Sequence, residues 1–138
     1  MSAALTEHDW DGARLLRQFE SCELPAAQFK HRQHVQLAWT LLAQLPMFTA
    51  LQRFRRALQA FARHNNVPGL YNETITCFYL LLIRERMDRL RPGHDWHEFA
   101  AQNPDLFTHP KSFLQAWYPG DSAFADGAKA AFILPAAT

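Results

Sequence analysis

The chain has 138 residues, of which 49% are hydrophobic and 20% are charged. This length suits one domain over residues 1–138, and the apolar content excludes a chain that is disordered throughout. The formal net charge of +1 is far below the basic excess of a typical nucleic-acid-binding domain, so we expect no nucleic-acid partner.

Cysteine usage and hydropathy indicate where the protein resides. Cys22 and Cys77 are too few for a disulfide framework, and residues 1–10 lack the features of a signal peptide. The longest apolar run, residues 77–83, is short compared with the roughly 20 residues that a membrane-spanning helix needs. The sequence therefore predicts a cytoplasmic protein that does not cross a membrane.

Proline and glycine divide the chain into segments of helical length. Long helices are predicted over residues 9–22, 29–45, 49–64 and 72–90. Shorter ones follow over residues 95–103 and 110–117, with one or two further turns within 122–132. No alternation of apolar and polar residues is long enough to predict a strand. We expect an all-α, single-domain bundle of five or six helices.

The predicted helix 29–45 carries an unusual apolar stripe that begins with His31 and His34. Residues three apart lie about 60° apart around a helix axis, so both rings can be directed at one point. Such a pair can bind a transition metal, or act as a base and its orienting partner. Structural use is the plainer alternative, in which a histidine near a helix start caps the helix, bonds to a backbone carbonyl or lies half exposed.

The next two predicted helices differ in where their charged and apolar residues lie. Helix 49–64 carries Arg53, Arg55, Arg56 and Arg63 on its polar face, and a solvated face is favoured over contact with phosphate or RNA. Helix 72–90 is apolar all round between residues 77 and 83, which is typical of a central helix. Asn72 is its expected N-cap.

A candidate site arises if helices 29–45 and 72–90 pack together. Glu73 would then join His31 and His34, either as the third ligand of a divalent transition metal (iron, zinc or manganese) or as a base. Tyr71, Asn72, Thr76 and Trp39 are the residues expected to bind a small molecule there. The alternative for Glu73 is a carboxylate that only stabilises the helix dipole.

Two segments resemble a family of small, uncharacterised bacterial proteins of all-helical fold. Residues 29–39 match its pattern Phe-x-His-x-x-His followed by Ala-Trp, and residues 71–76 match Tyr-His-Glu-Thr-x-Thr except at Asn72, where the pattern has histidine. The similarity extends through residues 99–106 to the tail near Phe132. The resemblance implies the fold and the location of a site at His31, His34 and Glu73, but no particular reaction. Asparagine cannot replace imidazole as a base, which weakens a four-ligand metal site.

Two functions from different classes follow from these observations. The first is a small cytosolic enzyme, metal-dependent or acid/base, in which His31, His34 and Glu73 act on a small molecule. The second is a non-catalytic helical module that binds a small molecule or a protein and uses its histidines structurally. Both leave open whether the protein forms a homodimer.

Overall fold

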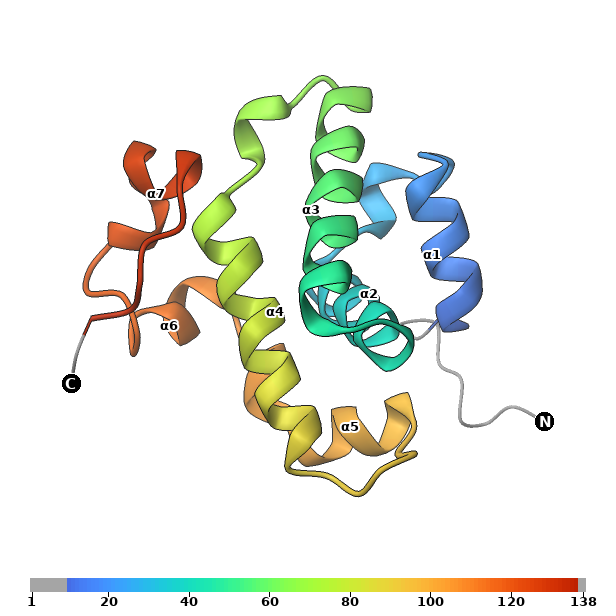
Figure 1. Ribbon diagram of the computed structural model, residues 1–138. Coiled ribbons are helices and arrows are strands. Elements are labelled where there is room, and N and C mark those ends of the chain that lie inside the picture. The colour runs from blue at the N-terminus through green and yellow to red at the C-terminus, as the bar shows by residue number, and fades with distance from the viewer. Residues whose placement is uncertain (1–9, 137–138) are drawn as a thin grey trace.

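The computed structural model describes residues 10–136, and within this range it contains helices and no strand (Figure 1). The all-α prediction is thereby confirmed. The α-helices are α1 (Gly12–Glu20), α2 (His31–Gln44), α3 (Met47–His64), α4 (Glu73–Asp88), α5 (Trp96–Gln102), α6 (Pro110–Leu114) and α7 (Asp126–Ala130). Short 3-10 helices lie between them: η1 (Ala26–Gln28), η2 (Pro68–Leu70), η3 (Pro104–Phe107) and η4 (Ser122–Phe124).

The described range holds seven α-helices, so the predicted count of five or six is wrong. The additional helix is the five-residue α7, which lies within the one or two turns predicted over residues 122–132 and was not counted as a helix. A helix of this length completes little more than one turn, so it shows no repeating apolar pattern in the sequence. The predicted bounds of the four long helices agree with the structure to within three residues at each end.

Three long helices, α2, α3 and α4, form the centre of the molecule and pack against one another (Figure 1). α1 lies against α2 and α3 on one side, and the C-terminal segment with α7 lies against α4 on the other. Leu80 and Ile83 in the middle of α4 are completely buried. The prediction of a central helix over this apolar run is confirmed.

Polar residues fix the two helix ends that matter most for the site. Asn72 caps α4, because its side-chain oxygen accepts a hydrogen bond from the backbone N–H of Ile75 at 3.0 Å. α3 ends at His64, and Asn66 then adopts a left-handed conformation with φ of 61°. The Val67 N–H returns to the Ala62 carbonyl at 2.8 Å, which closes the helix and turns the chain into η2.

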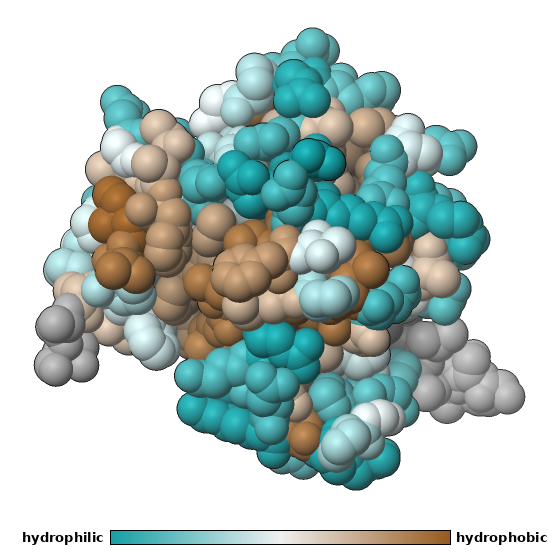
Figure 2. All heavy atoms as spheres, in the orientation of Figure 1, coloured by the Kyte–Doolittle hydropathy of each residue, from teal (hydrophilic) through white to brown (hydrophobic). Residues whose placement is uncertain are grey.

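The apolar surface of the molecule is uneven. In the space-filling view it gathers over the C-terminal segment and over the middle of α4 (Figure 2). Phe124, Ile133 and Leu134 are the large exposed hydrophobic residues of the C-terminal segment. Among the helices of residues 10–136, none combines the length and the hydropathy that crossing a bilayer requires.

Candidate functional site

A cavity of about 430 Å³ lies between α2, α3 and α4, and we call it the histidine cavity. Val67 and Leu70 line it and are exposed, which places its mouth at η2. Most of its lining is aliphatic or aromatic, and no Asp, Glu, Lys or Arg side chain takes part. Its polar lining residues are His31, His34, Asn65, Tyr71, Asn72, Thr76 and Tyr79.

His31, at the start of α2, is held in one tautomer. Its Nε2 lies 2.8 Å from the backbone carbonyl oxygen of Leu106. A carbonyl only accepts hydrogen bonds, so in the neutral ring Nε2 carries the proton and Nδ1 keeps its lone pair. Burial lowers the pKa of His31, although the Leu106 carbonyl opposes this shift, and the ring is therefore neutral at neutral pH.

His34 lies one helical turn further along and stacks on Phe29, with ring centroids 3.9 Å apart. Burial lowers the pKa of His34 to about 3, with a smaller contribution from His31. The side chain keeps a partly accessible surface and lines the histidine cavity. No hydrogen bond connects its ring to another residue of the described range, so both ring nitrogens can bond to a molecule in the cavity.

Tyr79 supplies a third polar group that the sequence analysis did not select. It lines the cavity from α4, and its ring packs edge-on against His31 at 5.1 Å between centroids. Its hydroxyl is buried and has no hydrogen-bond partner among the described residues, and burial raises its pKa. In the sequence, the signal that could have identified Tyr79 was its single hydroxyl group within the otherwise apolar run 77–83.

Glu73 does not join the histidines. Its carboxylate accepts hydrogen bonds from Arg55 Nε at 2.9 and 3.0 Å and from the Tyr71 hydroxyl at 2.5 Å, and it lies 2.8 Å from Arg55 Nη2. We call these three residues the Glu73 cluster. Burial alone would raise the pKa of Glu73, but the bonds from Arg55 and Tyr71 outweigh it and leave the pKa lowered.

This arrangement bears on the expected metal site. Glu73 is outside the set of residues that line the histidine cavity. Within residues 10–136 no group of three or more His, Cys, Asp or Glu side chains is placed to hold a metal ion. The divalent metal therefore stays a prediction, with His31 and His34 as its remaining ligands.

The other residues of the run 71–74 connect α4 to the C-terminal segment. The Asn72 side-chain nitrogen donates to the Ala123 carbonyl at 2.8 Å. The Thr74 hydroxyl donates to the Ala131 carbonyl at 3.0 Å and accepts from the Ile133 N–H at 3.1 Å. Asn72 lines the cavity, but with its capping bond to α4 both ends of its amide are already bonded.

Trp39 also lies outside the cavity lining. Its indole N–H donates to His94 Nε2 at 3.2 Å, on the side of α2 that faces the α4–α5 connection.

Of the residues expected to form the site, five line the histidine cavity: His31, His34, Tyr71, Asn72 and Thr76. Sequence spacing located the helix face correctly but could not show that Glu73 points to α3 instead.

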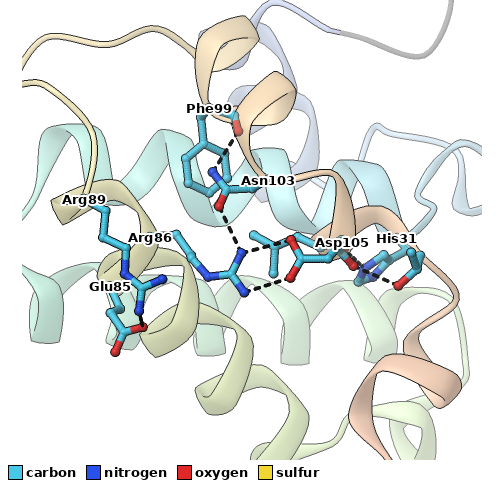
Figure 3. Close-up of polar contacts among 9 residues, drawn as sticks. His31, Glu85, Arg86, Arg89, Phe99, Asn103 and Asp105 are labelled. Carbon is cyan, nitrogen blue, oxygen red and sulfur yellow. Dashed lines mark hydrogen bonds and ion pairs between the residues drawn. The ribbon is translucent and has the colours of Figure 1, made fainter. Parts of the chain in front are cut away.

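A polar cluster on the other side of η3 holds the carbonyl that contacts His31 (Figure 3). Arg86 Nη1 donates to Asn103 Oδ1 and to Asp105 Oδ1, each at 3.0 Å, and Nη2 donates to Asp105 Oδ2 at 2.8 Å. The Asn103 amide donates to the Phe99 carbonyl at 2.9 Å. We call Arg86, Asn103 and Asp105 the Arg86 cluster. Asp105 directly precedes Leu106, so this cluster fixes the backbone beside His31.

Comparisons with known proteins give no relative: no family model matches the chain, and no curated protein or solved structure matches it. A functional argument for this chain therefore comes from its own residues and geometry.

Proposed function

We propose that the protein binds a small, uncharged and mainly apolar molecule in the histidine cavity. One observation carries this proposal: an apolar cavity of about 430 Å³ is lined by His31 and His34, whose ring nitrogens the described residues use for only one hydrogen bond. Ligand sites typically have volumes of about 300–1,000 Å³, apolar walls and a few convergent polar groups. His31 and His34 are those groups here, whereas the Tyr79 hydroxyl is fully enclosed.

The absence of charged side chains from the lining argues for an uncharged ligand. Moving an unpaired charge from water into an apolar cavity is strongly unfavourable. Both histidines have lowered pKa values and remain neutral at neutral pH, so they offer no compensating charge. An uncharged molecule avoids this desolvation cost and can still bond to the neutral rings.

Binding and catalysis share this site, and acid/base chemistry by His31 and His34 stays a prediction. A neutral imidazole with a free lone pair can act as a base. Arg55 and Glu73, next to the site, neutralise each other in the Glu73 cluster. The proposal is therefore limited to binding, which requires only the geometry already described.

A matched pair of fluorescent probes tests the proposal. N-phenyl-1-naphthylamine is uncharged, and 1-anilino-8-naphthalenesulfonate is its sulfonated analogue. We expect the uncharged probe to bind with a stoichiometry of one and at least about tenfold more tightly than the sulfonate, since one charge must be desolvated. Failure of the uncharged probe to bind, or equal binding of the sulfonate, would contradict the proposal.

Two alanines on α3 provide a matched pair of variants. Ala62 lines the histidine cavity, whereas Ala60 lies two residues earlier and outside its lining. The Ala62→Leu substitution places additional side-chain atoms in the cavity and should weaken binding of N-phenyl-1-naphthylamine. Ala60→Leu should leave the affinity unchanged. An equal effect of both variants would show that the probe binds elsewhere.

A further inference from the structure

The polar groups of the histidine cavity are not equivalent, because His31 donates from Nε2 to the protein and has only the acceptor Nδ1 left for a ligand. We propose that the ligand carries an O–H or N–H donor that bonds to His31 Nδ1, and that Arg86 is the positioning residue that keeps this nitrogen an acceptor. The inference rests on the proposed function and adds the chemical class of the ligand. It uses two contacts: His31 to Leu106, and Arg86 to Asp105.

The first step concerns the two nitrogens of His31. Nε2 donates its proton to the Leu106 carbonyl at 2.8 Å, and Leu106 is completely buried, so water does not compete for this bond. No hydrogen bond from a residue of the described range reaches Nδ1. A neutral imidazole has one N–H and one lone pair. The nitrogen left for a ligand is thus an acceptor, and it selects a donor.

The second step concerns how the Leu106 carbonyl is held. η3 is a single short turn, which has little rigidity of its own. Arg86 reaches across from α4 and bonds to Asn103 before this turn and to Asp105 within it (Figure 3). The Arg86 side chain is only 16% exposed, whereas the Asp105 carboxylate that it bonds to is 48% exposed. The planar guanidinium therefore fixes the turn, and with it the tautomer of His31.

The third step concerns competing states of the ring. A protonated His31 would carry N–H groups on both nitrogens and would repel a donor. Burial keeps the ring neutral. A half-turn of the ring about its Cβ–Cγ bond would put Cε1–H in place of Nε2–H against the Leu106 carbonyl, and the tautomer protonated on Nδ1 would put a lone pair there, so each costs the hydrogen bond. These alternatives are disfavoured as long as η3 stays in place.

The test compares 2-naphthol with 2-methoxynaphthalene, which has the same ring system but no donor. Each compound displaces N-phenyl-1-naphthylamine from the protein at pH 7. We expect 2-naphthol to bind about tenfold more tightly, and His31→Phe to remove this preference. Equal binding of both compounds to the wild-type protein would overturn the inference and leave the proposed function intact. Displacement by neither compound would also overturn the inference alone, whereas failure of N-phenyl-1-naphthylamine itself to bind would overturn the proposed function.

Arg86 and Arg89 give a matched pair of variants on α4. Arg89 lies almost one turn further along and pairs with Glu85, and both side chains are exposed (Figure 3). Arg86→Leu should reduce the preference for 2-naphthol, whereas Arg89→Leu should preserve it. If Arg86→Leu does not fold, Arg86→Lys keeps the charge without the planar fork and should reduce the preference too. An unchanged preference in the folded Arg86 variant would overturn its positioning role.

A spectroscopic readout separates positioning from general stability. Nitrogen-15 NMR of the His31 ring distinguishes the two neutral tautomers in the free protein. We expect a proton on Nε2 in the wild type and in Arg89→Leu, and a mixture of tautomers in the Arg86 variant. A proton on Nδ1 in the wild-type protein would overturn the inference directly.

Discussion

The Glu73 cluster and the polar groups of the histidine cavity lie side by side but differ in how fully their hydrogen-bonding capacity is used. Glu73 accepts from Arg55 and Tyr71, and the adjacent Asn72 and Thr74 are bonded to backbone groups. In the cavity, by contrast, His34 and Tyr79 make no hydrogen bond within the described range, and His31 makes one. Both regions contain residue types that are common in active sites.

The difference separates residues that hold the fold from residues available to a ligand. Saturated groups stabilise the folded state, so their substitution should lower stability and leave binding intact. Groups with unused capacity contribute little to stability, and their substitution should affect binding first. The following predictions test this separation, from the largest expected effect to the smallest.

The largest effect is expected for Asn72→Ala. This substitution removes the N-cap of α4 and leaves the Ala123 carbonyl without its donor. We expect the free energy of unfolding to fall by about 2–4 kcal/mol, measured by urea denaturation. Asn72→Asp keeps the capping oxygen and should lose only part of this. A loss below about 0.5 kcal/mol for Asn72→Ala would contradict the structural role.

Acid pH should destabilise the protein through His34. In the unfolded chain His34 binds its proton near pH 6.5, whereas in the folded protein its pKa is about 3. The full stabilisation is therefore present above pH 6.5, and it is lost as the pH falls toward 3. We expect the contribution to the slope to rise below pH 6.5 and to approach about 1.4 kcal/mol per pH unit between about pH 5.5 and about pH 4.

The His34→Gln variant isolates this contribution, because glutamine is polar but does not titrate in this range. Its free energy of unfolding, measured at a series of pH values, should decline less steeply than that of the wild type. Identical slopes for the two proteins would mean that His34 protonates as easily in the folded state as in the unfolded chain.

A smaller loss is expected for Glu73→Gln, which removes the charge that pairs with Arg55. The carboxylate is 16% exposed, so we expect a loss of about 1–2 kcal/mol in the free energy of unfolding. Glu20→Gln is a matched control. Glu20 of α1 pairs with Arg53, which like Arg55 belongs to α3, and this pair is more exposed, so the substitution should cost less than about 1 kcal/mol.

Binding of N-phenyl-1-naphthylamine to Glu73→Gln should equal that of the wild type, because Glu73 is outside the cavity lining. Fluorescence titration of the two proteins checks this. A large drop in affinity in a fully folded Glu73→Gln protein would show that the carboxylate belongs to the site after all.

The smallest effect is expected for Trp39→Phe. Phenylalanine retains most of the ring packing but cannot donate to His94, so the cost should be about 0.5–1 kcal/mol. Trp39 does not line the cavity, and probe affinity should not change. Thermal unfolding combined with one probe titration tests both expectations. Lost affinity without lost stability would place Trp39 in the binding site.

The sequence predicted the helical elements well because their signals are local. Asn72 was correctly identified as an N-cap, and the apolar run in α4 was correctly placed at the centre. The i, i+3 spacing correctly put His31 and His34 on one face. A helix as short as α7 carries too few residues for such a signal.

The hydrogen-bond partner of each polar group, and the tautomer of His31, could not be predicted, because they depend on contacts between segments that are distant in the sequence. Arg55 had been expected on the solvated face, but α3 presents it to Glu73, 18 residues further along the chain. The Leu106 carbonyl, 75 residues from His31, decides the tautomer of that ring. Spacing within one helix contains no information on these partners.

A crystal structure of the protein with 2-naphthol tests the central claim most directly. We predict that the naphthalene ring lies in the histidine cavity and that its hydroxyl donates to His31 Nδ1, while Nε2 stays on the Leu106 carbonyl. Density for 2-naphthol only outside this cavity, or a His31 ring turned so that Nε2 faces the probe, would contradict the account.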